Sequence, residues 1–191
     1  MTETSTAGRE IRRKERALTE EQALEVIDAT DHAVLCTTDL DGNPYGVPIT
    51  PVRVGRVLYF HHTAVAGGRL QDNMEMNPKV SVCFIGKQIT VPRLFTVDYA
   101  SAVAFGRASL VTDPGERGQA MMAIVTRHAP RNSMQRNAVQ FQNRLSKVAV
   151  WKIAIESVTG KARAAGVWVK GKTLHEPVEM PPQSWLAGLK D

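Results

Sequence analysis

The chain has 191 residues, of which 43% are hydrophobic and 23% charged, with 24 Lys+Arg against 19 Asp+Glu. This length suits one compact domain with or without tails, and the hydrophobic fraction is too high for a disordered chain. No apolar run approaches the roughly 20 residues that span a bilayer, and residues 1–16 lack the apolar segment of a secretory signal. We therefore expect a soluble cytoplasmic protein.

The positive charge is concentrated in two stretches. Residues 9–16 carry five basic and two acidic residues, and seven basic residues occur between Glu116 and Glu156 without any acid. Such stretches are typical either of solvated helix faces or of a cationic surface for phosphate or nucleic acid. Aromatic residues make up only 6% of the chain and do not interleave with the basic ones, so nucleic acid is the less favoured partner.

The first predicted element is a helix that begins after Thr19. The spacing of Thr19 and Gln22 is that of a capping box, in which each side chain binds the other residue's backbone amide. We expect the helix to run to about Ala29, with Leu24 and Ile27 on its buried side.

Residues 33–63 predict two hairpins. The apolar runs AVLCTTD, PYGVPITPV and RVLYFHH are separated by turns at 41–43 and at Gly55. The second run contains three prolines, which cannot donate ladder hydrogen bonds, so we expect it to be an edge strand, interrupted, or lining something. Cys36 and Cys83 lie in apolar runs and are predicted to be buried core residues.

Further strands are predicted at 79–86, 99–111 and 148–158, and two helices lie between the last two strands. The first helix begins at the N-cap Asp113 and continues through about Ala129, and the second covers about 134–145. Core positions expected on the first of these helices are Met121, Met122, Ile124 and Val125. Six strands without βαβ alternation favour a mainly β fold, an antiparallel barrel with flanking helices.

These elements divide the chain into three parts. Residues 1–17 form a basic N-terminal arm, residues 18–163 the barrel domain, and residues 164–191 a tail with three prolines. We expect the tail to wrap a surface or to stay mobile.

The candidate site follows an apolar strand. The usual motifs of hydrolases, metalloproteases and dinucleotide-binding folds are missing, and no cysteine or histidine spacing indicates a metal. His61 and His62 end the strand VLYFHH and precede a loop with Gly67, Gly68 and Arg69. Glycines allow close backbone approach and arginine suits phosphate, so the pattern predicts a phosphorylated cofactor at the barrel rim. A structural role for the histidines is the alternative.

Five segments in order resemble the flavin-binding split barrels related to pyridoxamine phosphate oxidase, and more closely the nitroimidazole-resistance proteins within them. Across about residues 12–163, the matching segments are RRKER, GNPYGVPI, LYFHHTAVAGGRL, YASAVAFGRA and VTGKAR. The resemblance implies a six-stranded split β-barrel and a homodimer, with FMN bound in clefts shared by the subunits.

The same resemblance implies cofactor-binding residues. The strand containing Val47, Pro48, Ile49 and Thr50 would run along the flavin ring, and the family's histidine corresponds to His61 or to His62, next to Thr63. Arg69 stands where the family usually has lysine and would bind the phosphate. The residues expected to approach the cleft from the same or the second subunit are Ser101, Lys161 and Arg163. For Lys161 and Arg163 the alternative is a solvated strand end.

The implied activity is that of a flavin-dependent oxidoreductase that reduces the nitro group of a nitroimidazole to an amine. Deazaflavin or haem are the alternative cofactors, since neutral imidazole is a common iron ligand. A flavin-binding protein without turnover and a basic nucleic-acid-binding or regulatory module remain the alternative functions. No catalytic residue and no metal ligand is assigned.

Overall fold

The computed structural model describes residues 11–64, 67–133, 135–137, 139 and 147–163. The predicted tail and most of the basic arm therefore lie outside the described residues. The elements in chain order are η2 (Lys14–Arg16), α1 (Glu20–Ala29), β1 (Ala33–Thr38), β2 (Pro44–Ile49), β3 (Val52–Val54), β4 (Val57–Thr63), α2 (Arg69–Met76), β5 (Lys79–Val91), η3 (Pro92–Leu94), β6 (Thr96–Leu110), α3 (Pro114–His128) and β7 (Val148–Arg163).

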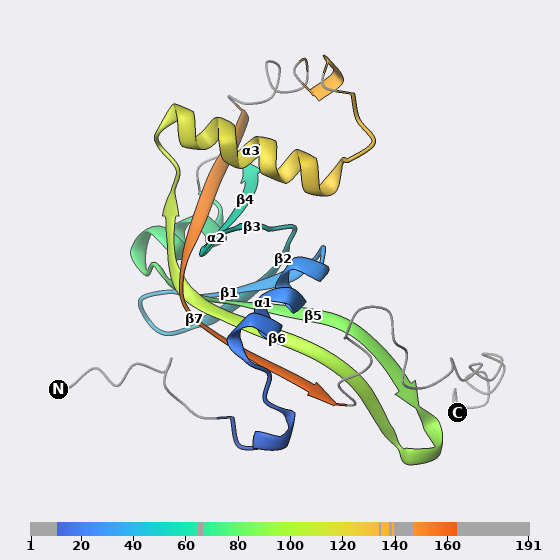
Figure 1. Ribbon diagram of the computed structural model, residues 1–191. Coiled ribbons are helices and arrows are strands. Elements are labelled where there is room, and N and C mark those ends of the chain that lie inside the picture. Colours follow the sequence, from blue (N-terminus) through green and yellow to red (C-terminus); the bar gives the residue numbers. More distant parts are fainter. Residues whose placement is uncertain (1–10, 65–66, 134, 138, 140–146, 164–191) are drawn as a thin grey trace, which may run out of the picture.

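The described strands form one antiparallel sheet in the order β2-β1-β5-β6-β7-β4-β3 (Figure 1). The expected mainly β fold, an antiparallel split β-barrel with flanking helices, is confirmed. It has seven strands instead of six, because the proline-rich segment is interrupted at Thr50 and Pro51. The two pieces, β2 and β3, become the two edges of the sheet, which does not close between them.

Helix α1 begins as the sequence predicts. The Thr19 hydroxyl accepts a hydrogen bond from the Gln22 amide at 3.2 Å, and the Gln22 side chain accepts one from the Thr19 amide at 3.0 Å. Ile27 is buried and Leu24 is half-buried against the core. The helix lies so close to β7 that a Cβ added at Gly160 would stand 2.7 Å from the Cβ of Ala23.

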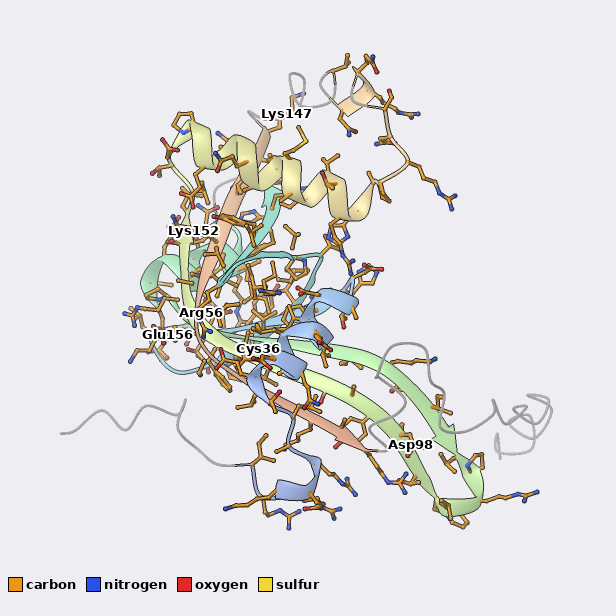
Figure 2. All side chains as sticks on the ribbon, viewed as in Figure 1. Cys36, Arg56, Asp98, Lys147, Lys152 and Glu156 are labelled. Carbon is orange, nitrogen blue, oxygen red and sulfur yellow. The ribbon has the colours of Figure 1, made fainter. Side chains whose placement is uncertain are left out.

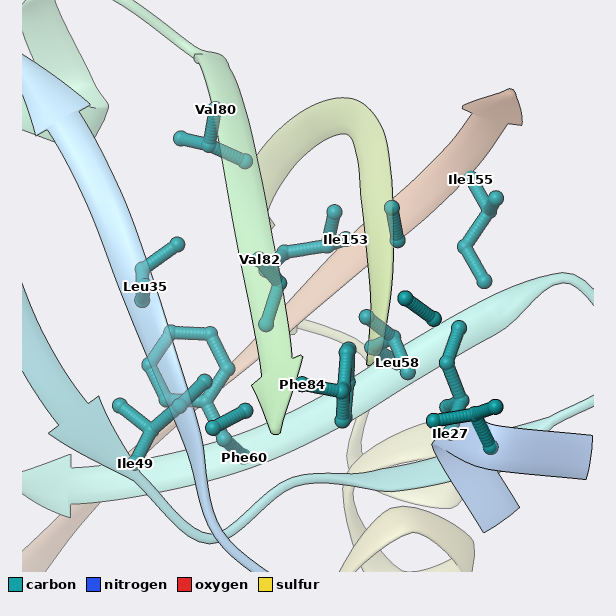
Figure 3. Packing of buried hydrophobic residues seen from close by; sticks show 14 of the residues in the cluster. Ile27, Leu35, Ile49, Leu58, Phe60, Val80, Val82, Phe84, Ile153 and Ile155 are labelled. Atoms are coloured by element: carbon teal, nitrogen blue, oxygen red, sulfur yellow. The ribbon is translucent and has the colours of Figure 1, made fainter. Parts of the chain in front are cut away.

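The core lies on one face of the sheet, here called the inner face, where Leu35, Phe60 and Phe84 are buried (Figure 3). The opposite outer face carries the two cysteines. Cys36 is exposed and Cys83 only half-buried, so the prediction that both are core residues is wrong. Side chains alternate along a strand, and the burial of Leu35 and Phe84 points the cysteines outward.

Helix α3 begins at its predicted cap, where Asp113 Oδ1 accepts a hydrogen bond from the Glu116 amide at 2.7 Å. Ile124 is buried, but Met122 is 49% exposed, so its assignment to the core is wrong. The helical period turns Met122 away from the face that carries Ile124. Of the second predicted helix, residues 135–137 and 139 are helical and the rest lies outside the described residues.

A polar cluster anchors the start of α3 to the sheet. The Lys152 ammonium on β7 donates to both carboxylate oxygens of Glu116 at 2.8 Å, and the Tyr59 hydroxyl on β4 donates to the same carboxylate at 2.9 Å. Because of these contacts, the hydrogen bonds from Lys152 and then Tyr59 lower the pKa of Glu116. The cluster fixes α3 above strands β3 and β4 (Figure 1).

Strands β5 and β6 continue as a two-stranded ribbon beyond their partners β1 and β7 (Figure 1). At its tip Phe95 has a left-handed backbone, with φ 46°, and is 98% exposed. Buried Asp98 pairs with Arg163 where the ribbon leaves the sheet, and Figure 2 shows Asp98 at the far end of β7 from Lys152. No helix in the described part of the chain is long and apolar enough to cross a membrane.

Candidate functional site

A cavity of about 230 Å³ lies between edge strand β2 and the end of β4. Six of the predicted site residues meet there. The lining residues are His32, Val47, Pro48, Ile49, Thr50, Phe60, His61, His62 and Leu70. Strand β2 pairs only with β1 among the described strands, so its other side can offer backbone groups to a ligand.

His62 provides a fixed nitrogen at this cavity. Its Nδ1 lies 2.9 Å from the carbonyl oxygen of Thr63, and because a carbonyl only accepts, Nδ1 carries the proton. In the neutral ring Nε2 is then an acceptor. Nε2 is buried and has no hydrogen-bond partner within the described part of the chain, while the ring stacks on Trp151 with centroids 6.3 Å apart. Buried polar atoms are nearly always hydrogen-bonded, so this nitrogen is the atom of the cavity lining that a bound group would satisfy.

His61, on the other face of the same strand, is exposed. Desolvation by the surrounding protein, and then the nearby His62 and His128, lower the pKa of His61 below its usual value of 6.5. His128 reaches this region from the end of α3, where its Nε2 lies 3.3 Å from the carbonyl oxygen of Pro51. His61 is therefore neutral near pH 7. Within the described residues, no three potential metal ligands gather closely enough to hold an ion.

Arg69 is the first residue of α2, immediately before the cavity residue Leu70. Its guanidinium lies over the ring of Tyr45, 4.7 Å from the centroid. The preceding Gly67 has φ +85°, a conformation that favours glycine, and the N-cap Gly68 provides no side-chain cap. The amides of the first turn and the arginine are thus available together for an anion.

The remaining predicted site residues are not among those that line this cavity. Thr63 is exposed and contributes its carbonyl to His62. Ser101 on β6 faces Lys161 on β7, and Arg163 pairs with Asp98. One chain alone therefore does not bring these three residues to the cavity.

Sequence reasoning missed His32, Phe60 and Leu70 as lining residues. A signal for His32 was present, because the hairpin register pairs Ala33 with Ile49 and so sets His32 beside Thr50. Leu70 directly follows Arg69 and could have been found from the same loop. Phe60 is a core residue, 1% exposed. Its position in an apolar strand therefore did not mark it as a lining residue.

The sequence matches the family model for pyridoxamine 5'-phosphate oxidase over residues 19–162. The chain belongs to this family. The pyridoxamine 5'-phosphate oxidase match begins at the N-cap of α1 and includes nearly all of β7, so it spans the whole sheet. The predicted resemblance is thereby confirmed. No curated protein matches the sequence.

Solved structures share the fold at low sequence identity. A proposed 5-nitroimidazole antibiotic resistance protein from Bacteroides thetaiotaomicron is 23% identical, with a TM-score of 0.62 over 76% of this chain and 85% of that one. The flavocytochrome Anf3 from Azotobacter vinelandii is 21% identical, with a TM-score of 0.64 over 90% and 78%. A FAD and haem binding protein from Mycobacterium smegmatis is 18% identical, with a TM-score of 0.59 over 91% and 80%.

The residues at the cavity fit the flavin that such a family implies. Val47 and Ile49 give apolar contact for a flat ring, His62 Nε2 gives an acceptor for an N–H group, and Arg69 gives a cation for a phosphate. The volume of about 230 Å³ is smaller than the roughly 300–1,000 Å³ typical of sites that enclose a cofactor.

Proposed function

We propose that the chain is an oxidoreductase that binds FMN at this cavity and reduces nitroaromatic or similar small acceptors. The observation that carries the proposal is the buried acceptor Nε2 of His62 beside the open edge of β2. Likeness to a proposed 5-nitroimidazole resistance protein supports the choice of acceptor. Bound FMN would supply the electron chemistry, two electrons at a time.

In this proposal the protein binds, orients and shields the cofactor. Val47 and Ile49 would give the ring apolar contact, and His62 Nε2 would accept a hydrogen bond from an N–H of the cofactor. Arg69 and the first turn of α2 hold the phosphate. His61, whose lowered pKa keeps it uncharged at pH 7, adds no positive charge beside the ring.

We further propose that two copies of the chain form a homodimer that completes the site. Support comes from the small cavity of one chain and from the distance along the sheet between it and Ser101, Lys161 and Arg163. The outer face of the sheet also carries apolar side chains that are only half-buried, among them Val34, Val103 and Phe105. A second copy packed on this face would remove them from water.

The absorption spectrum of the purified chain tests the cofactor. After incubation with FMN we expect a flavin spectrum near one equivalent per chain, and turnover of a nitroimidazole with a nicotinamide donor. His62→Phe keeps an aromatic ring against Trp151 but removes the acceptor, so FMN binding should weaken about tenfold. A colourless protein that cannot be loaded with FMN contradicts the proposal.

Haem is the second candidate, because His61 is both exposed and held neutral, as an iron-ligating imidazole must be. Haem titration would then give a sharp Soret band that His61→Ala removes and Arg69→Ala leaves in place. A flavin spectrum without a Soret band in the same preparation decides for FMN.

A further inference from the structure

Thr37 of β1 and Asn73 of α2 are buried polar residues, each 2% exposed. The side-chain nitrogen Nδ2 of Asn73 donates a hydrogen bond to the Thr37 hydroxyl at 3.0 Å, and this hydroxyl donates to the carbonyl oxygen of Tyr45 at 3.3 Å. Thr37 and Tyr45 are also paired across β1 and β2. Because buried polar groups are costly unless they are hydrogen-bonded, this chain of bonds is a fixed connection from α2 through β1 to β2.

The connection sets which face of α2 turns toward the sheet. Arg69 and Asn73 are four residues apart in the helix, so they lie on the same face, one turn from each other. Since Asn73 is held over β1, Arg69 is directed toward the neighbouring strand β2. Its guanidinium lies there over the ring of Tyr45, 4.7 Å from the centroid.

Arg69 keeps its positive charge available for an anion. Arg53, for example, donates to a carboxylate, whereas Arg69 forms no ion pair within the part of the chain that the structure describes. The carboxylate of nearby Asp39 accepts hydrogen bonds from the Asn43 amide at 2.8 Å and from Asn43 Nδ2 at 2.9 Å. The aromatic face of Tyr45 attracts the guanidinium without neutralising it.

Tyr45 stands in line with the apolar side of the candidate flavin cavity. Side chains alternate along a strand, so Tyr45, Val47 and Ile49 share one face of β2, and the last two line the cavity. Two residues of a strand span about 7 Å, so Tyr45 comes about 7 Å before Val47 along β2. A ligand with a flat apolar part and an anionic end would meet Val47 with the first and Arg69 with the second.

We propose that Tyr45 is a positioning residue of this site and that it makes the site prefer phosphorylated over unphosphorylated flavin. The ring of Tyr45 holds the Arg69 guanidinium, while Thr37 and Asn73 hold the helix that carries it. An arginine already held in place loses less rotamer entropy when it binds a phosphate. The inference rests on the proposed binding of FMN and adds the residues that set its selectivity.

Fluorescence titrations with FMN and with riboflavin test the preference. Tyr45→Leu removes the aromatic face, so the ratio of FMN affinity to riboflavin affinity should fall about threefold to tenfold. Tyr45→Phe keeps the face and should keep the ratio. Asn73→Leu cuts the connection to Thr37 and should also lower the ratio. Gln71→Leu is the matched control, because the Gln71 amide donates to Glu75 of the same helix, and the ratio should stay unchanged.

A second measurement needs no cofactor. In an NMR spectrum of the free chain at slightly acidic pH, the ring current of Tyr45 should shift the Nε–H signal of Arg69 upfield, because a proton over a ring face is shielded. Arg69→Lys identifies the signal by removing it. Tyr45→Leu and Asn73→Leu should each abolish the upfield shift, and Tyr45→Phe should retain it.

Thermal melts of each variant verify folding, and if either Tyr45→Leu or Asn73→Leu is unfolded, the other decides the result. An unchanged affinity ratio in these folded variants, or equal losses in Tyr45→Leu and Tyr45→Phe, would overturn the inference. The proposed function would then stand, because the unsubstituted chain still binds FMN. A chain that binds no FMN would refute the proposed function and this inference with it, even with the upfield Arg69 signal present.

Discussion

Arg69 is the residue whose replacement best tests the phosphate assignment. It stands at the start of α2 over Tyr45, and its guanidinium suits a phosphate group. A charge-assisted hydrogen bond contributes about 1.5–3 kcal/mol, so Arg69→Ala should weaken FMN binding about tenfold to a hundredfold. Arg69→Lys keeps the charge and should lose less. Fluorescence titration with FMN measures the change.

Riboflavin, which has no phosphate, is the control for that experiment. Its affinity should hardly respond to either substitution at Arg69. Equal losses for riboflavin and FMN would mean that Arg69 shapes the ring pocket through Tyr45, and the phosphate assignment would be wrong.

His61 should make the free energy of unfolding depend on pH below about pH 7. Desolvation, with His62 and His128 nearby, lowers the pKa of His61, so below about pH 6.5 the unfolded chain binds a proton that the folded chain resists. The free energy of unfolding should therefore fall as the pH drops from 7 towards 5. Urea unfolding at several pH values measures it. His61→Gln should flatten the profile, and a slope unchanged by that substitution would contradict the assignment.

At the scale of elements, alanine substitutions at two glycines should change the free energy of unfolding in opposite directions. A Cβ at Gly160 would meet Ala23 and Leu18, so Gly160→Ala should push α1 off β7 and lower the free energy of unfolding by about 1–3 kcal/mol. Gly118 lies inside α3 with open space around it, and Gly118→Ala should raise the free energy by about 0.5–1 kcal/mol. Chemical denaturation measures both. A neutral Gly160→Ala would show that α1 is not docked this closely.

Local chemistry made several elements predictable. The capping residues Thr19 and Asp113 act on amides within their own first turn, so the starts of α1 and α3 could be inferred from short segments. Cys36 could not be placed correctly, because both faces of its strand carry apolar residues and the alternation is hidden. Burial there depends on which face meets α1 and the core, and this is a property of the assembled sheet.

At the scale of the whole molecule, part of the candidate site was predictable and part was not. The three prolines indicated an edge or interrupted strand, and both descriptions hold, since β2 and β3 are the opposite edges of the sheet. Placing His32 at the site required the strand register, which single-sequence reasoning did not use. Long-range pairing between strands distant in sequence determines which loops meet, and no short motif encodes it.

The proposed dimer makes a prediction for the assembled protein. A ligand bound only by the associated state favours association, so FMN should shift the sedimentation of the chain from monomer towards dimer at micromolar concentration. Phe105→Lys places a charge on the outer face and should give a folded monomer, while Met122→Lys on exposed α3 should not. A monomer with one bound flavin per chain would contradict the shared site.

The pairing of β4 with β7 has a consequence for how the chain is made. Val57 pairs with Ala154 and His62 with Ala149, so two strands from opposite halves of the sequence must meet. During synthesis the N-terminal half emerges first, and β4, with Leu58 and Phe60, has only β3 beside it until residues 148–163 have left the ribosome. In that interval the nascent chain presents an apolar open edge, which is the kind of surface that invites aggregation. A transcript truncated before β7 should therefore yield insoluble product, where the full-length chain folds.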